Sequence, residues 1–361
     1  MILKKELEFS KFVFIALLLS GMICISSAFA DSTGSTTSAQ GATQTITDMA
    51  GNVVTIPADI ERLADLWHAH NEVVLMLGAG DKLVATTSNI KALPFFKKVY
   101  PRIDDIPAAQ TGTGAGDISM ETLVSTKPEV VVLSSATNET LDKLKEAGIP
   151  AVIITFTNFD DLKKAFKLSG SMLGDSEKQK ADEYISYLDS KLSSIKDISS
   201  KIPADKKLSV IHIQSLDPLK IDGSNTIIDS WINVAGATNA AAKDVKGNMQ
   251  QVTFEQIQSY DPDVIIIGGT MKDKDTIKND PKWQALKAVK NDKVYVNPKG
   301  VFSWDRYGAE EALQIQWAAK TLYPDLFTNI NIKEELKTFY KDYFDYSLAD
   351  DDIESILNPT A

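Results

Sequence analysis

The chain has 361 residues and a formal net charge of −11, which becomes −12 without residues 1–30, because those carry three lysines and two glutamates. An acidic surface repels the phosphates of nucleic acid and of anionic lipid, so the composition argues against both as partners. The length after residue 45 suffices for two domains of ordinary size. Cys24 is the single cysteine, so no intramolecular disulfide can form.

The first 30 residues have the pattern of an export signal. Charged side chains between Lys4 and Lys11 precede an apolar run from Phe12 to Ile25, and Ala28-Phe29-Ala30 offers small residues to a signal peptidase. A membrane-spanning helix needs about 20 apolar residues, and this run is shorter. We therefore expect removal of residues 1–30, an N-terminus at Asp31, and a periplasmic or other extracytoplasmic location.

Cys24 lies inside the segment that we expect to be removed. A lipid on Cys24 is the alternative, but Gly21-Met22-Ile23 fits a lipoprotein cleavage site poorly, and we expect no lipid there. Residues 31–45 consist almost entirely of Ser, Thr, Gly, Ala and Gln, which have little to bury. They are predicted to form a flexible linker before the folded body.

The remaining sequence alternates short, β-rich apolar runs with stretches of helical periodicity, the pattern of parallel sheets flanked by helices. It predicts an α/β fold of two Rossmann-like lobes, residues 46–174 and residues 201–361. The strands expected in the N-terminal lobe are Leu63–Trp67, Leu83–Thr86, Val130–Leu133 and Ala151–Ile154. Those of the C-terminal lobe are Leu208–Ile213, Val264–Ile267 and Val294–Val296, with helices at Thr226–Ala235, Thr253–Tyr260 and Ala309–Leu322.

Residues 175–200, between the lobes, differ from the rest of the chain. They contain no glycine or proline, and their apolar residues fall on one helical face: Ala181, Tyr184, Ile185, Leu188, Leu192 and Ile195. At 1.5 Å per residue, the segment from Ser176 to Ile198 forms a helix of roughly 30 Å. An ordinary surface helix within one lobe is the alternative. Because this helix separates two α/β patterns and is followed by Pro203, we predict a rigid helix that joins the lobes.

The two halves also repeat one another. Met120–Leu123 leads to the strand at Val130, and Phe254–Ile257 leads to the strand at Val264, with Glu121 and Glu255 each seven residues before a proline. Both units read as a short helix, capped by Ser119 or Thr253, followed by a buried strand. The repeat supports two lobes built on one plan.

The sequence resembles the helix-linked class of periplasmic binding proteins that serve ABC importers. The resemblance begins at Ile46–Pro57, continues through Asn71–Gly78 and ends at Trp317–Pro324. It implies that a ligand is held in a cleft between the lobes and that the joining helix permits a small hinge motion. The ligands of this class are iron–siderophore complexes, haem, vitamin B12 and, in some members, free metals or oxyanions.

The resemblance also implies two docking residues. In this class, one glutamate on each lobe, at the start of the helix before the Pro-Asp strand, meets arginines of the membrane permease. Glu121 and Glu255 occupy those places. The alternative is that each carboxylate merely favours the positive end of its helix dipole. We expect a monomer that delivers its ligand to a permease dimer.

Candidate ligand residues follow the first strand of the N-terminal lobe. Trp67, His68 and His70 lie where the carboxyl edge of an open α/β sheet exposes its loops, and histidines two apart point the same way if the strand continues. Either histidine could contact a metal or an oxyanion, or could simply bond to the backbone. His212, near the end of the first strand of the other lobe, is the candidate partner across the cleft, with a buried core histidine as the alternative.

The segment Phe302–Tyr307 follows a strand and precedes a helix, which places it at the rim of the cleft. Arg306 is one of three arginines in the chain, and a planar bidentate donor between Trp304 and Tyr307 suits a carboxylate, a catecholate or an oxyanion. The alternative is a surface ion pair with Asp305 or Glu310.

Two weaker signals complete the candidate site. Trp67, Trp231 and Trp304 could wall a large ligand, although a tryptophan is more often part of the core. The glycine-rich loop Gly112–Asp117, with Thr113, could present backbone amides to an anion or form a plain turn.

The sequence thus favours an extracytoplasmic solute-binding protein and not an enzyme. It lacks a Gly-x-Ser-x-Gly elbow and a His-Glu-x-x-His pair, and an exported hydrolase without a recognisable motif is the alternative of another class. We expect no intrinsic cofactor. A metal chelate of the iron–siderophore type is the first candidate ligand, a corrinoid such as cobalamin or an oxyanion such as molybdate or tungstate is the alternative, and direct metal contact is left open.

Overall fold

The computed structural model describes residues 41–112 and 117–360, and the chain from Gly41 onward forms one compact unit. The predicted signal peptide, Cys24, most of the predicted linker and Thr113 lie outside the described residues. Within the described part of the chain, no helix combines the length and apolarity needed to cross a bilayer.

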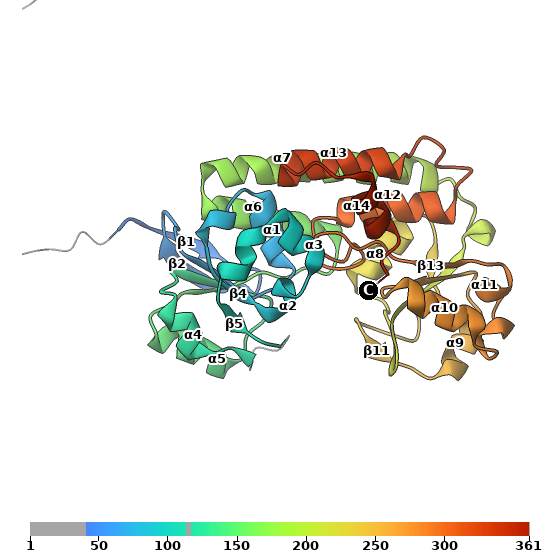
Figure 1. Cartoon of the computed structure of the whole chain (residues 1–361), viewed down its shortest axis with the longest axis horizontal. Coiled ribbons are helices and arrows are strands. Elements are labelled where there is room, and N and C mark those ends of the chain that lie inside the picture. The colour runs from blue at the N-terminus through green and yellow to red at the C-terminus, as the bar shows by residue number, and fades with distance from the viewer. Residues whose placement is uncertain (1–40, 113–116, 361) are drawn as a thin grey trace, which may run out of the picture. The chain divides into compact units, whose positions relative to one another are not determined.

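The N-terminal lobe is built on a parallel five-stranded sheet of order β5-β4-β3-β6-β7, shown in Figure 1. Its strands are β3 (Leu63–Asp65), β4 (Leu83–Thr87), β5 (Ala108–Gln110), β6 (Val130–Leu133) and β7 (Ala151–Ile153). Its helices are α1 (His70–Met76), α2 (Ser88–Lys91), α3 (Pro94–Val99), α4 (Met120–Ser125), α5 (Asn138–Glu146) and α6 (Phe159–Leu173). The alternation of strand and helix follows the predicted pattern.

The C-terminal lobe has a mixed sheet of order β11-β9-β8-β12-β13, in which β8, β12 and β13 are parallel and β10 also pairs with β8. Its strands are β8 (Ser209–Leu216), β9 (Leu219–Ile221), β10 (Thr238–Asn239), β11 (Gln250–Gln251), β12 (Val264–Ile267) and β13 (Val294–Val296). Its helices are α8 (Ile227–Val234), α9 (Phe254–Tyr260), α10 (Met271–Asn279), α11 (Lys287–Lys290) and α12 (Glu311–Leu322). The two-lobed α/β prediction is therefore confirmed.

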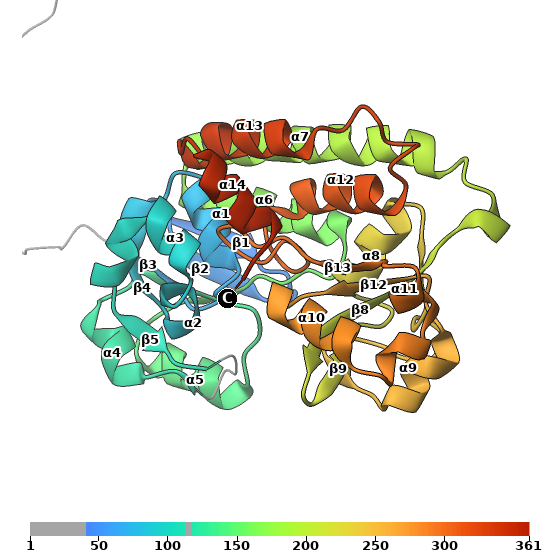
Figure 2. The same ribbon diagram turned by 45° about the vertical axis from the view of Figure 1, so that its right-hand side comes forward.

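The predicted joining helix is α7 (Asp175–Ser199), which packs on α6 of one lobe and on α8 and α12 of the other. Figures 1 and 2 show it running beside α13 (Ile332–Phe344), and Tyr187 of α7 contacts Phe339 and Tyr343 there. The last helix, α14 (Asp350–Leu357), reaches back to the N-terminal lobe, because its Asp352 pairs with Lys98 of α3. The C-terminal segment therefore touches both lobes.

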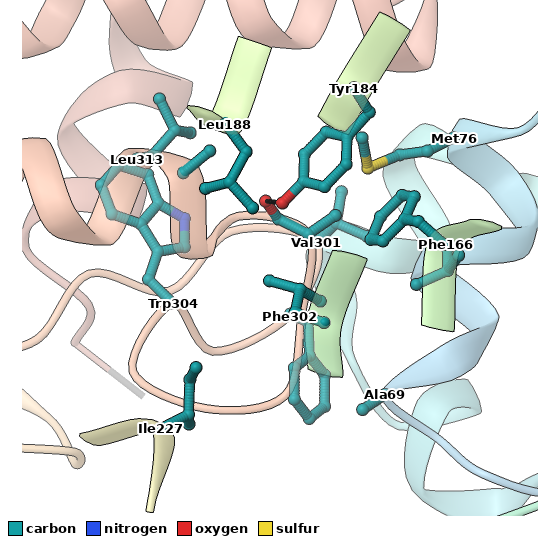
Figure 3. Packing of buried hydrophobic residues seen from close by; sticks show 14 of the residues in the cluster. Ala69, Met76, Phe166, Tyr184, Leu188, Ile227, Val301, Phe302, Trp304 and Leu313 are labelled. Atoms are coloured by element: carbon teal, nitrogen blue, oxygen red, sulfur yellow. Dashed lines mark hydrogen bonds between the residues drawn. The ribbon is translucent and has the colours of Figure 1, made fainter. Parts of the chain in front are cut away.

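The apolar core is not divided cleanly between the lobes. Two clusters belong to one lobe each, but the largest continues from β3 and α6 through α7 to α8 and α12. In Figure 3, Tyr184 and Leu188 of α7 project toward Val301 and Trp304 of the C-terminal lobe, near Phe166 of α6. The rings of Tyr184 and Phe166 stack with centroids 3.9 Å apart. Because side chains of both lobes pack on α7 in this core, neither lobe can move far without disturbing the packing on α7.

A hairpin that the sequence analysis did not predict precedes the first lobe. Strands β1 (Thr43–Thr47) and β2 (Val53–Pro57) are antiparallel, so β1 begins three residues inside the segment expected to be a linker. The Asp48 carboxylate accepts hydrogen bonds from the backbone of Ala50, Asn52 and, on β7, Ile153. The first two bonds close the turn of the hairpin, and the bond from Ile153 ties the hairpin to the sheet.

The repeated unit has the same local structure in both lobes. The Ser119 side chain caps α4 by accepting from Thr122 N–H, and Thr253 forms a capping box with Gln256 at α9. Each helix leads to a fully buried strand, β6 or β12. The predicted short helices, their caps and the strands after them are confirmed.

Candidate functional site

On the N-terminal lobe, the first strand is shorter than predicted, and this separates the two histidines. β3 ends at Asp65, so Trp67 and His68 lie in the following loop while His70 begins α1. His70 is fully buried, with Nδ1 2.8 Å from Asp65 Oδ2 and Nε2 2.7 Å from Ser169 Oγ. Both ring nitrogens are engaged inside the lobe. The idea that His68 and His70 face the ligand together is therefore wrong in its geometry.

His68 remains at the edge of the lobe, partly buried, and faces the other lobe. Its ring lies 5.6 Å from that of Phe302, centroid to centroid, in the loop after β13. Burial, together with the nearby charge of Arg306, lowers the pKa of His68 to about 4. The imidazole is therefore neutral at neutral pH and lies within the field of Arg306. The structure thus brings His68 and Arg306 together across the two lobes.

Arg306 is held by a buried carboxylate next to it in the sequence. Its Nε lies 3.1 Å from Asp305 Oδ1, one Nη lies 3.3 Å from Asp305 Oδ2, and the same Nη donates to the Gly268 carbonyl at 3.4 Å. Asp305 is 1% exposed, while 22% of the Arg306 side chain is exposed. The ion pair considered as an alternative is present but lies in the interior. Among the described residues, the second terminal nitrogen of Arg306 makes no hydrogen bond.

His212 belongs to the same network but is closed off from solvent. Its Nδ1 lies 2.8 Å from Asp222 Oδ2, and its Nε2 lies 3.0 Å from Asp305 Oδ2, a contact outside regular hydrogen-bond geometry. Burial opposes the charged ring, but the hydrogen bond to Asp222 and the close carboxylate of Asp305 prevail and raise the pKa of His212 to about 9. His212 is therefore a charged residue beneath Arg306, and we expect it to support the site without touching the ligand.

Several residues near Arg306 were not singled out in the sequence. Lys299 is partly buried, and burial together with the charge of Arg306 lowers its pKa. Its amine makes no hydrogen bond or ion pair within the described part of the chain. Gln214 places Nε2 3.4 Å from Asp305 Oδ2, and its buried Oε1 has no partner among the described residues. Gln214 lies within β8 and Lys299 follows β13, and both residue types are too common to signal a site.

Tyr307 completes the contacts between the lobes. Its backbone is in the left-handed region, with φ +50°, and its hydroxyl bonds to Asn248. Its ring lies 6.2 Å from that of Trp67 and 6.1 Å from that of Phe156, both of the N-terminal lobe. A side chain held at positive φ marks a position that the surrounding structure over-determines, as is common at binding sites.

The tryptophans are core residues rather than an open wall. Trp304 and Trp231 are fully buried, and Trp67 is 5% exposed. Trp304 Nε1 donates to Glu310 Oε1 at 2.9 Å, and Trp231 Nε1 donates to the Asp305 carbonyl at 3.3 Å. Trp304 therefore shapes the loop from within, which corrects its prediction as a ligand contact. Trp67 can offer the ligand no more than a ring edge.

Glu121 and Glu255 are exposed in the first turns of α4 and α9, one on each lobe. A bond to its own backbone and one to Thr253 lower the pKa of Glu255. Neither residue contacts the network around Arg306. Their positions suit contact with another molecule, and their predicted docking role stays a prediction.

Metal ligands do not cluster at this site. Within residues 41–112 and 117–360, no three His, Cys, Asp or Glu side chains are arranged to hold a metal ion. The polar side chains at the site are a guanidinium paired with a carboxylate, an amine, a neutral imidazole and an amide, and the guanidinium and the amine are donors that suit anions.

Comparison with known proteins identifies the family. A family model described as periplasmic binding protein matches residues 66–300. The chain belongs to the periplasmic binding protein family. Among its relatives, the molybdate-binding protein MolA of Haemophilus influenzae is 28% identical over 85% of this chain and 92% of its own length. An uncharacterized ABC transporter substrate-binding lipoprotein of Bacillus subtilis, YvrC, is 29% identical over 78% of this chain and 86% of its own length.

A solved structure of a periplasmic solute-binding protein from Veillonella parvula has a TM-score of 0.76 and 28% identity, covering 88% of this chain and 97% of that one. This family member is thus the substrate-binding protein of an ABC transporter and acts outside the cytoplasm. Its relatives are solute-binding transport proteins and not enzymes, which favours transport over hydrolysis.

The charged state of His212 predicts a pH-dependent stability. An unfolded histidine has a pKa of about 6.5, so the stabilisation from a folded pKa of about 9 is complete below the unfolded value and is lost as pH rises through the folded value. Its full size is roughly 3 kcal/mol. Urea unfolding of the wild type and of His212→Asn, from about pH 6 to about pH 9.5, measures the difference. A difference in unfolding free energy that stays constant across this range would contradict the assignment.

Proposed function

We propose that this chain captures a compact oxyanion of the molybdate or tungstate class between its lobes and delivers it to an ABC permease. The observation that carries the proposal is the convergence of basic side chains from two lobes. Burial lowers the pKa of His68 on one lobe and of Lys299 on the other, and the charge of Arg306 lowers both further, so each of the two lies within the field of Arg306. A bound anion offsets that positive field.

The contacts between the lobes favour a small ligand. Trp67 and Phe156 already meet the ring of Tyr307, and His68 meets Phe302. A large ligand would have to separate these pairs, while the core shared through α7 resists a wide opening. A tetrahedral oxyanion needs little space and matches the fork of an arginine. The likeness to the molybdate-binding protein of Haemophilus influenzae supports the same class.

A ferric chelate, the ligand favoured from sequence, is the second candidate. The observation in its favour is the set of aromatic rings around Arg306, because a guanidinium between rings also suits a catecholate or carboxylate chelator. A corrinoid such as cobalamin fits the contacting lobes least, since it is the largest of the three. Size and charge separate the candidates experimentally.

The ligand class can be tested directly. Protein purified without chelators is analysed by native mass spectrometry and elemental analysis, and then by thermal shift with molybdate, tungstate, sulfate, ferric citrate, a ferric hydroxamate and cobalamin. A ligand at a hundred times its dissociation constant stabilises the folded state by about 2.7 kcal/mol. We expect molybdate and tungstate to stabilise most, with sulfate as the control for any small dianion. Stabilisation by a ferric chelate alone would replace the oxyanion with the second candidate.

The residue assignments predict a specific pattern of affinities for molybdate. Arg306→Lys keeps the charge but loses the planar fork, and the affinity should fall by about 1 to 3 kcal/mol. His68→Ala should weaken binding without unfolding, because the side chain is only partly buried. If both touch one small ion, the double mutant deviates from additivity by more than about 0.5 kcal/mol. Titration calorimetry measures all four proteins, and wild-type affinity in both single mutants would move the site elsewhere.

Permease docking is a separate proposal that rests on Glu121 and Glu255. We propose that these exposed carboxylates meet basic residues of a permease dimer, with the binding protein docking as a monomer. Charge reversal of both, Glu121→Lys with Glu255→Lys, should abolish uptake and leave molybdate affinity in solution unchanged, since neither lies near Arg306. Reversal of another exposed helix-start carboxylate, Glu139→Lys on α5, is the matched control. Loss of affinity in the double variant would place these residues wrongly.

A further inference from the structure

One buried carboxyl group of the N-terminal lobe is bonded to the loop that carries Arg306. Glu72, on α1, is fully buried. Its Oε2 accepts from Ala309 N–H at 2.9 Å, and its Oε1 accepts from Glu310 N–H at 3.3 Å. These two amides belong to the C-terminal lobe, just before α12. Glu72 therefore crosses from one lobe to the backbone of the other.

The approach is so close that a side chain at Gly308 would displace the Glu72 carboxyl group. A Cβ atom at Gly308 would lie 2.3 Å from Glu72 Oε2, well inside contact distance. The carbonyl of Ala309 is held as well, because Tyr184 of α7 donates its hydroxyl to that oxygen at 2.7 Å. The peptide group between Ala309 and Glu310 is thus held through its N–H by Glu72 of α1 and through its C=O by Tyr184 of the joining helix.

The other end of the same loop is fixed by Glu310. Its carboxylate accepts from Phe302 N–H at 2.9 Å, from Trp304 Nε1 at 2.9 Å and from the Tyr340 hydroxyl at 2.5 Å. Residues 302–310, which we call the ligand loop, are therefore held near both ends by buried carboxyl groups. Glu310 holds the Phe302 end and Glu72 holds the Ala309 end, with Arg306 and Tyr307 between them. Glu72 supplies the attachment that comes from the opposite lobe.

The two carboxyl groups also affect each other's pKa. Burial and the neighbouring charge of Glu310 raise the pKa of Glu72 well above its ordinary value, and burial raises the pKa of Glu310 to about 7. A glutamine in place of Glu72 would keep one acceptor oxygen for a backbone N–H and put an amide donor in place of the other. An alanine would remove both.

We propose that Glu72 is a positioning residue for ligand capture. It couples the position of the ligand loop, and hence of Arg306, to the position of the N-terminal lobe. Glu72 does not touch the ligand. The proposal rests on the proposed function in one respect, namely that Arg306 binds the ligand. It deepens that function, because the lobe opposite to Arg306 helps to place it.

The first test needs no ligand and measures hydrogen exchange by mass spectrometry in peptides covering residues 302–310. We expect Glu72→Ala to exchange there at least roughly tenfold faster than the wild type, because the bonds to Ala309 and Glu310 are lost. Glu72→Gln keeps only one of the two acceptor oxygens, so it should exchange at a rate between those of the wild type and Glu72→Ala. The matched control is Glu311→Gln, since Glu311 is equally buried on α12 and its oxygens have no partner among the described residues.

The second test measures molybdate affinity by calorimetry on the same proteins. Glu72→Ala should bind about tenfold more weakly, Glu72→Gln should lie between Glu72→Ala and the wild type, and Glu311→Gln should bind like the wild type. Should Glu72→Ala fail to fold, Gly308→Ala perturbs the same contact from the other lobe and should give the same two effects.

The outcomes separate the two proposals. Unchanged exchange in Glu72→Ala and in Gly308→Ala, or equal effects of Glu72→Gln and Glu72→Ala, would overturn the positioning role. If molybdate binds none of the proteins, including the wild type, the oxyanion proposal fails, but the exchange measurement still decides whether Glu72 holds the loop.

Discussion

Both lobes bury apolar side chains in one cluster that continues through α7, and this shared core constrains everything polar around it. A lobe cannot rotate far without exposing part of that cluster or breaking the stack of Phe166 on Tyr184. Polar groups between the lobes are therefore shielded from water, and each needs a hydrogen-bond partner nearby. The ligand loop meets this demand with the two carboxyl groups Glu72 and Glu310, which together take four of its N–H groups.

The same constraint explains the charges beneath Arg306. An arginine that is mostly buried would be unfavourable alone, and Asp305 compensates for it at hydrogen-bond distance. Burying Asp305 in turn requires more than one positive neighbour, which His212 supplies in its charged form, and Asp222 balances His212. The four charged groups thus alternate in sign from the interior to the edge of the lobe, in the order Asp222, His212, Asp305 and Arg306. The arrangement fixes the guanidinium before any ligand arrives, and a preorganised donor loses less entropy on binding.

The fold was largely predictable from the sequence because its signals are local. Hydrophobic runs gave the strands, and the caps at Ser119 and Thr253 gave the repeated units, since both patterns act over a few residues. The candidate site was harder to predict from the sequence. His70 was assigned to the cleft because β3 seemed to continue past Asp65, and the buried partners Asp65 and Ser169 are set by tertiary packing. Glu72 has no local signal at all, because its partners lie more than 200 residues away, at |i−j| = 237 and 238.

The pairing of Arg306 with Asp305 also bears on release. A guanidinium that faced an empty site without a carboxylate would bind an anion tightly but would leave an uncompensated charge when the anion departs. With Asp305 at 3.1 Å, a departing anion of the proposed class would leave a satisfied ion pair behind, so part of the attraction is already used in the free protein. Burial and the charge of Arg306 lower the pKa of His68 in the free state, and the proposed anion would favour its protonation. Binding is then coupled to proton uptake, and losing that proton weakens the hold on the anion. We infer that the site is built for exchange, as a protein that must surrender its cargo to a permease requires.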